Sequence, residues 1–251
     1  MPARLSRVVL VVAATTVAVV MAAGSAVATP SPPRGRAGTG AIPPVLRLRP
    51  GVQVTSGLKN PELAGYAVTP SALVTAKATI KIPLLACAPS GETGIAPGVW
   101  LDGFDGWSGA YALQYCTNGQ VTYDAAAAIN TAQTILFTVK PGDTIVVSVS
   151  QTAGKSVATV HDLTSGMSKT LSGAGGDATQ ALVGDGGVTF GGVLGGVPRF
   201  KSYPVSSASV GGQPLGSAHP VSVERVKGKT VQLMPTAITG GNAFKVVFKH
   251  T

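Results

Sequence analysis

The sequence has little charge, little cysteine and little histidine. Only 12% of its 251 residues are charged, against about 25% in typical soluble domains. Two cysteines are too few for a scaffold of several disulfides or for a zinc site of four thiolates. The three histidines, His161, His219 and His250, show no metal-ligand spacing. We therefore expect neither a metal ion nor a cofactor.

Acidic residues are scarcer than basic ones. Ten Asp and Glu stand against 19 Lys and Arg, which gives a formal net charge of +9. A basic protein can favour anionic partners such as cell-wall polymers. The sequence has no dense cluster of Lys and Arg with interleaved aromatic residues, and this argues against nucleic acid as a partner.

Helix-breaking residues are abundant. The chain contains 33 Gly and 18 Pro, and hydrophobic residues make up 45% of it. This hydrophobic content is too high for a disordered chain. The glycines and prolines, with Val and Thr throughout, argue against a helical bundle and predict an all-β domain.

The first residues are typical of a secretory signal peptide. Arg4 and Arg7 precede an uncharged apolar run over residues 8–23, and Ala26-Val27-Ala28 offers a cleavage site. We predict cleavage after Ala28 and export, with an uncleaved membrane anchor as the alternative. No second apolar run of this length follows, so no membrane association is expected after cleavage.

Export places both cysteines in an oxidising compartment. We therefore predict a disulfide between Cys87 and Cys116, with two buried free thiols as the alternative. Residues 29–57 are rich in Pro and Arg and are predicted to be a linker or pro-segment. Residues 58–251 are predicted to form the folded domain.

Short alternating segments separated by turns indicate a sandwich or barrel. The pattern over residues 135–149, with Lys140-Pro141-Gly142-Asp143 as its turn, predicts a hairpin with one buried face. Ala125 to Ala132 is the one helix candidate, and the glycine-rich stretch from Gly173 to Gly196 is interpreted as turns and a loop. Further strands are expected over residues 75–82, 157–163, 221–225, 231–233 and 244–248.

Several motifs in order resemble those of the glutamic peptidases, or eqolisins. Ala64-Gly65-Tyr66 resembles the end of their N-W-A-G-Y opening, and Leu113-Gln114 resembles the L-Q strand that carries their catalytic glutamine. Further matches lie at residues 79–83, 99–106, 118–125, 140–149, 157–163 and 200–248. The resemblance implies an antiparallel double-sheet sandwich of the concanavalin type, curved to make a groove. It also implies secretion and, in active members, an endopeptidase that works at acid pH.

The resemblance also assigns the catalytic positions. In this family a glutamate activates water as a general base and a glutamine amide stabilises the oxyanion. Gln114 fits the glutamine role, but the two glutamate positions hold Gln180 and Gly184. Only Asp185 remains as a possible displaced base. Alternation along a strand should point it away from the face of residues 180, 182 and 184, unless the nearby glycines bend the strand.

The substrate groove is also altered. Its expected residues are Trp100, Asp105 and Tyr123, but Ala126 to Ile129 stand where the family has W-Y-E-W. This loss of aromatic walls predicts a wider, weaker groove. A register shift of a few residues is the alternative interpretation.

Two classes of function follow, and they leave open whether the protein is an enzyme. The first is a secreted, catalytically inactive eqolisin-like sandwich that binds a peptide, a glycan or an anionic wall polymer in its groove. The second is an active acid endopeptidase with Asp185 as its carboxylate. A structural wall-associated protein would differ from the first class only in lacking a ligand.

Overall fold

The computed structural model describes residues 39–42, 57–69, 75–103, 106–152 and 154–251. The predicted signal peptide, its cleavage site and Asp105 lie outside these residues. Within the described part of the chain, no helix is long and apolar enough to cross a membrane.

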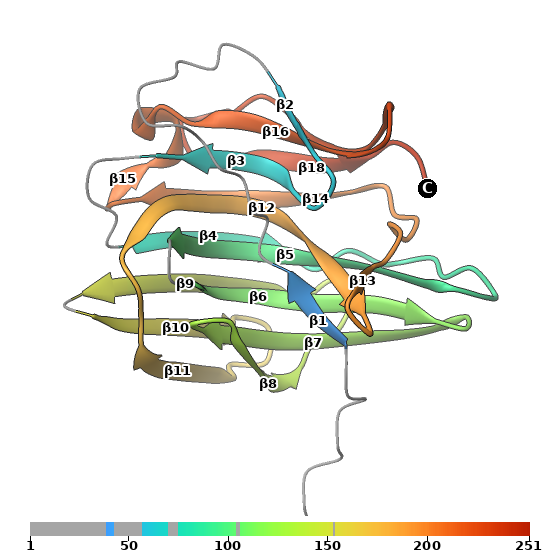
Figure 1. Cartoon of the computed structure of the whole chain (residues 1–251), viewed down its shortest axis with the longest axis horizontal. Helices are drawn as coiled ribbons and strands as arrows, with labels where there is room; N and C mark the ends of the chain where they lie inside the picture. Colours follow the sequence, from blue (N-terminus) through green and yellow to red (C-terminus); the bar gives the residue numbers. More distant parts are fainter. Residues whose placement is uncertain (1–38, 43–56, 70–74, 104–105, 153) are drawn as a thin grey trace, which may run out of the picture. The chain divides into compact units, whose positions relative to one another are not determined.

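The described strands form two stacked layers (Figure 1). We call them the front sheet and the back sheet, after their places in Figure 1. The order in the front sheet is β16-β3-β12-β5-β6-β7-β8. Its strands are β3 (Ala64–Val68), β5 (Glu92–Gly103), β6 (Gly106–Thr117), β7 (Gln120–Ile129), β8 (Ala132–Thr138), β12 (Ala178–Phe190) and β16 (Val221–Lys227).

The order in the back sheet is β17-β18-β14-β4-β9-β10-β11, and the β16–β17 hairpin joins the two layers. Its strands are β4 (Thr75–Lys81), β9 (Thr144–Thr152), β10 (Lys155–Asp162), β11 (Ser168–Ala174), β14 (Ser202–Val210), β17 (Thr230–Pro235) and β18 (Phe244–Phe248). The short elements are β1 (Thr39–Ile42), β2 (Leu58–Asn60), β13 (Val193–Leu194), β15 (Gln213–Pro214) and the 3-10 helix η1 (Leu215–Ala218). The predicted antiparallel double-sheet sandwich is confirmed.

Alternating burial explains the back sheet. In β4, β9 and β10 every second residue is buried, and the residues between are part or fully exposed. Their buried residues, such as Ile80, Val147 and Val160, meet Val99 and Val183 of the front sheet in one core between the layers. The long strands β5, β6 and β12 are buried on both faces, because the outer face of the front sheet carries a second apolar cluster.

The predicted hairpin over residues 135–149 is wrong. Ile145, Val147 and Val149 are buried as expected, but β9 pairs with β4 and β10, whereas β8 pairs with β7. The turn at residues 140–143 therefore crosses from the front sheet to the back sheet. Alternation shows that a strand has a buried face, but it does not show which strand lies beside it.

Two other expectations are corrected. The alanine run is not a helix, because Ala125–Ile129 belongs to β7 and Ala132 begins β8; cross-strand pairing overrides the helix propensity of alanine. The glycine-rich stretch is mainly strand β12. Its Gly184 faces Gly65 of β3, where a Cβ atom would lie 2.3 Å from the Ala64 carbonyl oxygen, so glycine permits the close approach of these strands.

The predicted linker contributes one strand. Residues Thr39–Ile42 pair antiparallel with Gly187–Phe190 of β12. Over these four residues the segment expected to precede the domain is therefore part of its sheet.

The predicted disulfide is confirmed. Cys87 and Cys116 are bonded, with their Cα atoms 5.5 Å apart. The bridge ties the segment that follows β4 to the end of β6.

Candidate functional site

The residues of the candidate site lie on adjacent strands of the front sheet. The register of β12, β5, β6 and β7 determines which side chains share a face, because directly paired residues point the same way. One face looks into the core between the layers, and the other is the outer face of the front sheet. The expected site residues are divided between these two faces.

Gln114 lies on the core face. It pairs with Ile95 of β5 and Tyr123 of β7, which both belong to the core between the sheets. Its side chain is fully buried, and neither amide atom has a hydrogen-bond partner in the described structure. An unpartnered buried amide is costly, and in this position it cannot reach a substrate on the outer face.

Asp185 is also buried and is engaged in an ion pair. Its Oδ2 atom lies 3.4 Å from Nη1 of Arg225, and its Oδ1 accepts a hydrogen bond from the Ala96 amide at 3.1 Å. Tyr203 of the core lies beside the same carboxylate. Burial raises the pKa of Asp185 to about 7, although Arg225 and the Ala96 amide act in the opposite direction. Asp185 therefore has the surroundings of a carboxylate with a structural role inside the protein.

Arg225 itself is held by backbone groups as well. Its Nη2 atom donates to the Gly195 carbonyl at 3.0 Å, and burial lowers its pKa. One feature of the sequence pattern indicates this residue. Arg225 follows Val221 and Val223 at alternating positions of one strand, where a charged residue on an apolar face requires a buried partner.

Gln180 lies on the opposite face from Gln114. It pairs with Asp102 of β5, next to the pair Leu182 and Trp100 that belongs to the outer apolar cluster. Its Nε2 atom donates a hydrogen bond to Oδ2 of Asp102 at 3.3 Å. The position that the resemblance gives to a catalytic glutamate therefore holds an amide paired with a carboxylate from the neighbouring strand.

Aromatic side chains gather on this outer face. The rings of Trp100 and Tyr111 are stacked at 5.9 Å, and Trp107 lies 6.3 Å from Tyr111. The Tyr111 hydroxyl donates to Oε1 of Gln133 at 2.6 Å. We call this surface, with Trp100, Trp107 and Tyr111, the aromatic face.

The aromatic face explains the alanines of β7. Ala126 pairs with Tyr111, and Ala128 pairs with Gly109, which lies opposite Trp100. A Cβ atom on Gly109 would lie 2.5 Å from the Trp100 ring, so small residues give these rings their space. Rings from β5 and β6 occupy the area where β7 has only methyl groups, and the expected wider groove stays a prediction.

The expected groove residues do not come together. Trp100 lies on the aromatic face, whereas Tyr123 lies on the core face, where its hydroxyl accepts a hydrogen bond from the Leu85 amide at 2.9 Å. Asp105 is outside the described residues. Asp102, Tyr111 and Trp107 were missed, although alternation from Trp100 already places Asp102 beside it on one face.

One further carboxylate stands on the outer face. Asp124 pairs with Leu113 of the outer cluster, and the Thr138 hydroxyl lies 3.4 Å from its Oδ1. Burial raises the pKa of Asp124, while the Thr138 hydroxyl lowers it. Asp102, Asp124 and Gln133 are half-buried, so they form a polar rim beside the buried rings.

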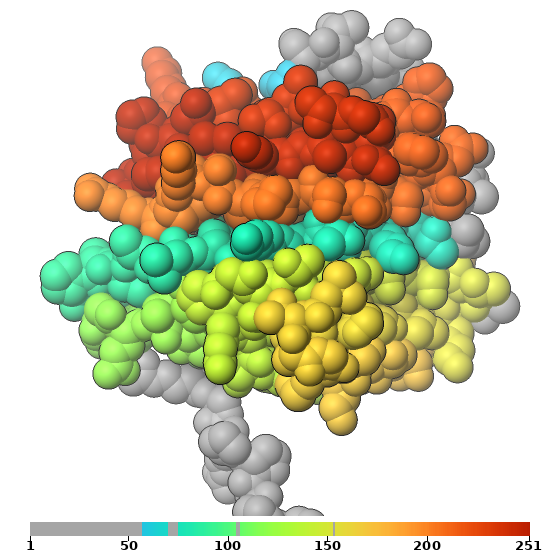
Figure 2. All heavy atoms as spheres, turned by 180° about the vertical axis from the view of Figure 1, so that it is seen from behind, coloured from blue at the N-terminus to red at the C-terminus, as the bar shows by residue number. Residues whose placement is uncertain are grey.

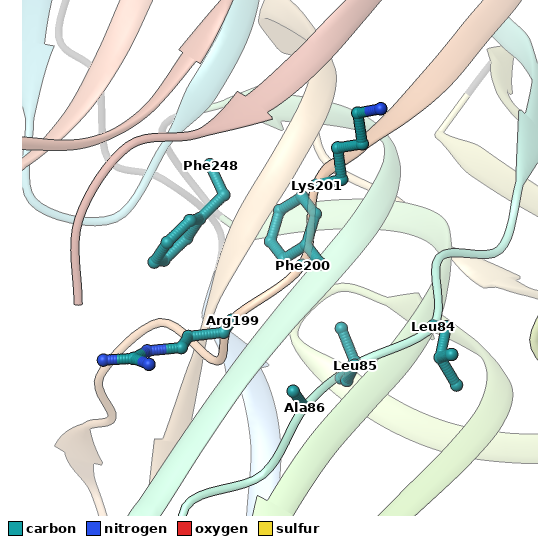
Figure 3. Close-up of a pocket in the computed structure, with 7 residues that line it drawn as sticks. All are labelled: Leu84, Leu85, Ala86, Arg199, Phe200, Lys201 and Phe248. Carbon is teal, nitrogen blue, oxygen red and sulfur yellow. The ribbon is translucent and has the colours of Figure 1, made fainter.

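A hollow of about 440 Å³ lies elsewhere, between the segment after β4 and the end of β18 (Figure 3). Leu84, Phe200 and Phe248 provide apolar walls, and Arg199 and Lys201 flank it. None of the residues of the aromatic face lines this hollow. In the described part of the chain, no cluster of His, Cys, Asp and Glu is arranged to hold a metal ion.

Comparison with known proteins gives one family. The sequence model of the peptidase A4 family matches residues 61–184. No curated protein sequence matches the chain. The fold is similar to that of a scytalido-glutamic peptidase solved with a transition-state analogue inhibitor, at 16% identity and a TM-score of 0.61, over 75% of this chain and 98% of that one. It is similar to the eqolisin SCP-B, solved with the tripeptide Ala-Ile-His, at 18% identity and a TM-score of 0.61, over 74% and 97% of the chains.

Proposed function

The chain belongs to the peptidase A4 family of glutamic peptidases, and from this premise we propose that it is an exported member that binds an extended peptide on the aromatic face without hydrolysing it. One observation carries the proposal. Gln114, at the glutamine position, and Gln180, at one of the two glutamate positions, lie on opposite faces of the front sheet. The amide and the carboxylate of a glutamic peptidase must act on the same substrate carbonyl.

The remaining acid positions support the same conclusion. Gly184 has a φ of 152° and no room for a side chain against the Ala64 carbonyl, so a glutamate there is sterically excluded. Asp185 is buried and bound to Arg225. An amide at Gln180 neither takes up nor returns a proton in the working pH range.

The aromatic face supports peptide binding. Trp100 and Tyr111 are fully buried and Trp107 is 7% exposed, so the stacked rings form an apolar floor beneath the surface. The half-buried polar rim of Asp102, Asp124 and Gln133 above them offers the hydrogen-bond partners for an extended chain. The family and the peptide ligand of SCP-B favour a peptide over a glycan. The disulfide suits an oxidising compartment outside the cell.

Activity is tested with the purified protein and an unfolded protein substrate between pH 2 and pH 7. We expect no cleavage above the blank. The variants Gln180→Glu and Gln114→Ala should be equally inactive, because neither brings the two groups onto one face. Cleavage by wild type that Gln114→Ala abolishes would contradict the proposal.

Binding is tested by intrinsic fluorescence. Both tryptophans of the chain, Trp100 and Trp107, lie on the aromatic face, so their emission reports directly on a ligand there. Titration with a pool of unstructured peptides should shift the emission, and Trp107→Phe with Tyr111→Ala should weaken binding at least tenfold. Phe248→Ala, in the separate hollow, serves as the control. No response to peptides, or a response to neutral glycans alone, would reject a peptide as the ligand.

A second candidate function rests on the hydrogen bond between Gln180 and Asp102. A carboxylate and an amide side by side are the two groups that this chemistry needs. Here β5 provides the carboxylate of Asp102 and β12 provides the amide of Gln180. In this alternative Asp102 activates water and Gln180 binds the oxyanion. It predicts cleavage at acid pH that Asp102→Asn abolishes and that Gln114→Ala and Asp185→Asn leave unchanged, provided that both variants fold.

A further inference from the structure

The outer face of the back sheet is covered with hydroxyl groups. The outward positions of β4, β9, β10, β11 and β14 alternate with the buried core positions, and most of them hold Ser or Thr. Figure 2 shows this side of the molecule, with β14 in orange between β18 in red and β4 in teal. We call this surface the hydroxyl face.

The strand register arranges the hydroxyl groups in rows across the sheet. One row runs through Ser209, Lys77, Ser148, Thr159 and Thr170, each from a different strand. Neighbouring positions in such a row are about 4.8 Å apart. The hydroxyls of Thr159 and Thr170 lie 3.0 Å from each other, within hydrogen-bond distance.

The charge of the hydroxyl face has one sign. Lys77, Lys81, Lys155 and Lys245 are exposed on it, and none of the chain's ten Asp and Glu residues occupies an outward position on these strands. Among the described residues none of the four ammonium groups forms an ion pair. The face therefore presents four uncompensated positive charges within a field of neutral hydroxyls.

The spacing of these charges indicates the kind of partner. Lys77 and Lys81 are four residues apart on one strand, or roughly 13 Å, and Lys245 lies two strands from Lys81, or roughly 10 Å. A duplex nucleic acid carries a charge about every 1.7 Å along its axis, which these separated ammonium groups do not match. A polymer that carries hydroxyl groups beside its charges supplies partners both for the ammonium groups and for the hydroxyls that lie between them.

We propose that the hydroxyl face binds an anionic polysaccharide. The ammonium groups pair with its carboxylates or phosphates, and the Ser and Thr hydroxyls, each both donor and acceptor, bond to sugar hydroxyls. An extended polymer that lies across the strands can contact several rows at once, so weak single contacts add together. This surface lies on the opposite sheet from the aromatic face, and its function is independent of whether that face binds a peptide.

Binding is measured with polygalacturonate, a polysaccharide with regularly spaced carboxylates, by affinity electrophoresis of the full chain at low ionic strength. We expect retardation by polygalacturonate and none by neutral dextran. Polyglutamate, which carries carboxylates without hydroxyls, should retard the protein several-fold less. Single-stranded DNA of equal charge concentration is included as the competing polyanion.

Matched variants locate the site. The triple variant Lys77→Ala, Lys81→Ala, Lys245→Ala should weaken polygalacturonate binding at least tenfold. The triple variant Lys59→Ala, Lys227→Ala, Lys229→Ala removes the same charge from exposed positions elsewhere and should change it less than threefold. Thr79→Val, which exchanges a hydroxyl for a methyl group of the same shape, should weaken binding to polygalacturonate but not to polyglutamate.

The proposal is overturned by any of three results. The first is no retardation of the wild type by polygalacturonate. The second is an equal loss in both triple variants, which would indicate net charge alone. The third is tighter binding of DNA than of polygalacturonate. Thermal unfolding of each variant shows that a loss of binding does not result from a loss of folding.

Discussion

Asp185 and Arg225 form the buried ion pair at the end of the core, and this pair makes the fold sensitive to pH. The folded pKa of Asp185, about 7, lies above the ordinary carboxyl value of 3.8. A carboxyl group with a raised folded pKa contributes stability that is complete below about pH 3.8 and is lost as the pH rises through 7. The protein should therefore be more stable in mild acid than at neutral pH, as far as this group is concerned.

We predict that the melting temperature falls as the pH rises from 5 to 8. The loss corresponds to a free energy of unfolding on the order of a few kcal/mol at most. Asp185→Asn should flatten this dependence, and Glu92→Gln, at an exposed position, should leave it unchanged. Thermal unfolding followed by circular dichroism measures all three proteins. An unchanged slope in Asp185→Asn would refute the assignment.

Glycine at position 98 is required by the tyrosine beside it. A Cβ atom there would lie 2.4 Å from Cβ of Tyr111 and 2.6 Å from the Ala110 carbonyl oxygen. Gly98→Ala should lower the free energy of unfolding by roughly 1 to 3 kcal/mol or more, because the strands must separate. Urea unfolding checks this. Gly196→Ala, which meets only a Thr93 methyl group at 3.3 Å, is the control and should cost less.

At the scale of the element, the segment after β4 is fixed from several sides. The Ala86 amide donates to the Arg199 carbonyl at 2.8 Å, the Leu85 amide donates to the Tyr123 hydroxyl, and Cys87 is bonded to Cys116. Leu84 is nevertheless 73% exposed. Leu84, which lines the hollow in Figure 3, is therefore held in place by the bonds of its neighbours in the chain rather than by burial of its own side chain.

Removing the disulfide should weaken the whole domain. The bonded cysteines are 29 residues apart, and closing a loop of this length stabilises a protein by roughly 3 to 4 kcal/mol in the chain-entropy model. The double variant Cys87→Ser, Cys116→Ser should lose about this much in urea unfolding. Adding a reductant should destabilise wild type and leave the double variant unchanged. Equal stability of the two proteins would show that the bridge carries no net stabilisation.

At the scale of the whole molecule, the N-terminal prediction is open to direct measurement. Cleavage after Ala28 is predicted from the basic N-terminal residues Arg4 and Arg7, the apolar run over residues 8–23 and the site Ala26-Val27-Ala28. The intact mass of protein collected from culture medium should match residues 29–251. A secreted species that still begins at Met1 would contradict the prediction.

The two outer faces of the sandwich differ in kind. The front sheet carries buried aromatic rings and half-buried acids, whereas the back sheet carries hydroxyls and lysines. A double-sheet sandwich thus offers two surfaces of separate chemistry on one core. We propose that both surfaces bind ligands, a peptide on the front sheet and an anionic polysaccharide on the back sheet.

The fold class, most strands and the disulfide could be predicted from the amino-acid sequence. Alternating residues such as Ile145, Val147 and Val149 define a buried face through local geometry alone. Two cysteines in a chain that is predicted to be exported leave only one intramolecular disulfide to form. The absence of a glutamate at positions 180 and 184 is likewise a property of the sequence, and it alone predicts a defective catalytic site.

The face that each site residue occupies and the pairing of neighbouring strands became known only from the three-dimensional fold. Gln114 matches the family motif in sequence, yet the register with Ile95 and Tyr123 turns it into the core. The pairing of Asp102 with Gln180 and of Asp185 with Arg225 joins residues far apart in the chain. A shift of the strand register by one residue reverses the face of every side chain in a strand. The register depends on the partner strands, and local sequence patterns do not encode which strands these are.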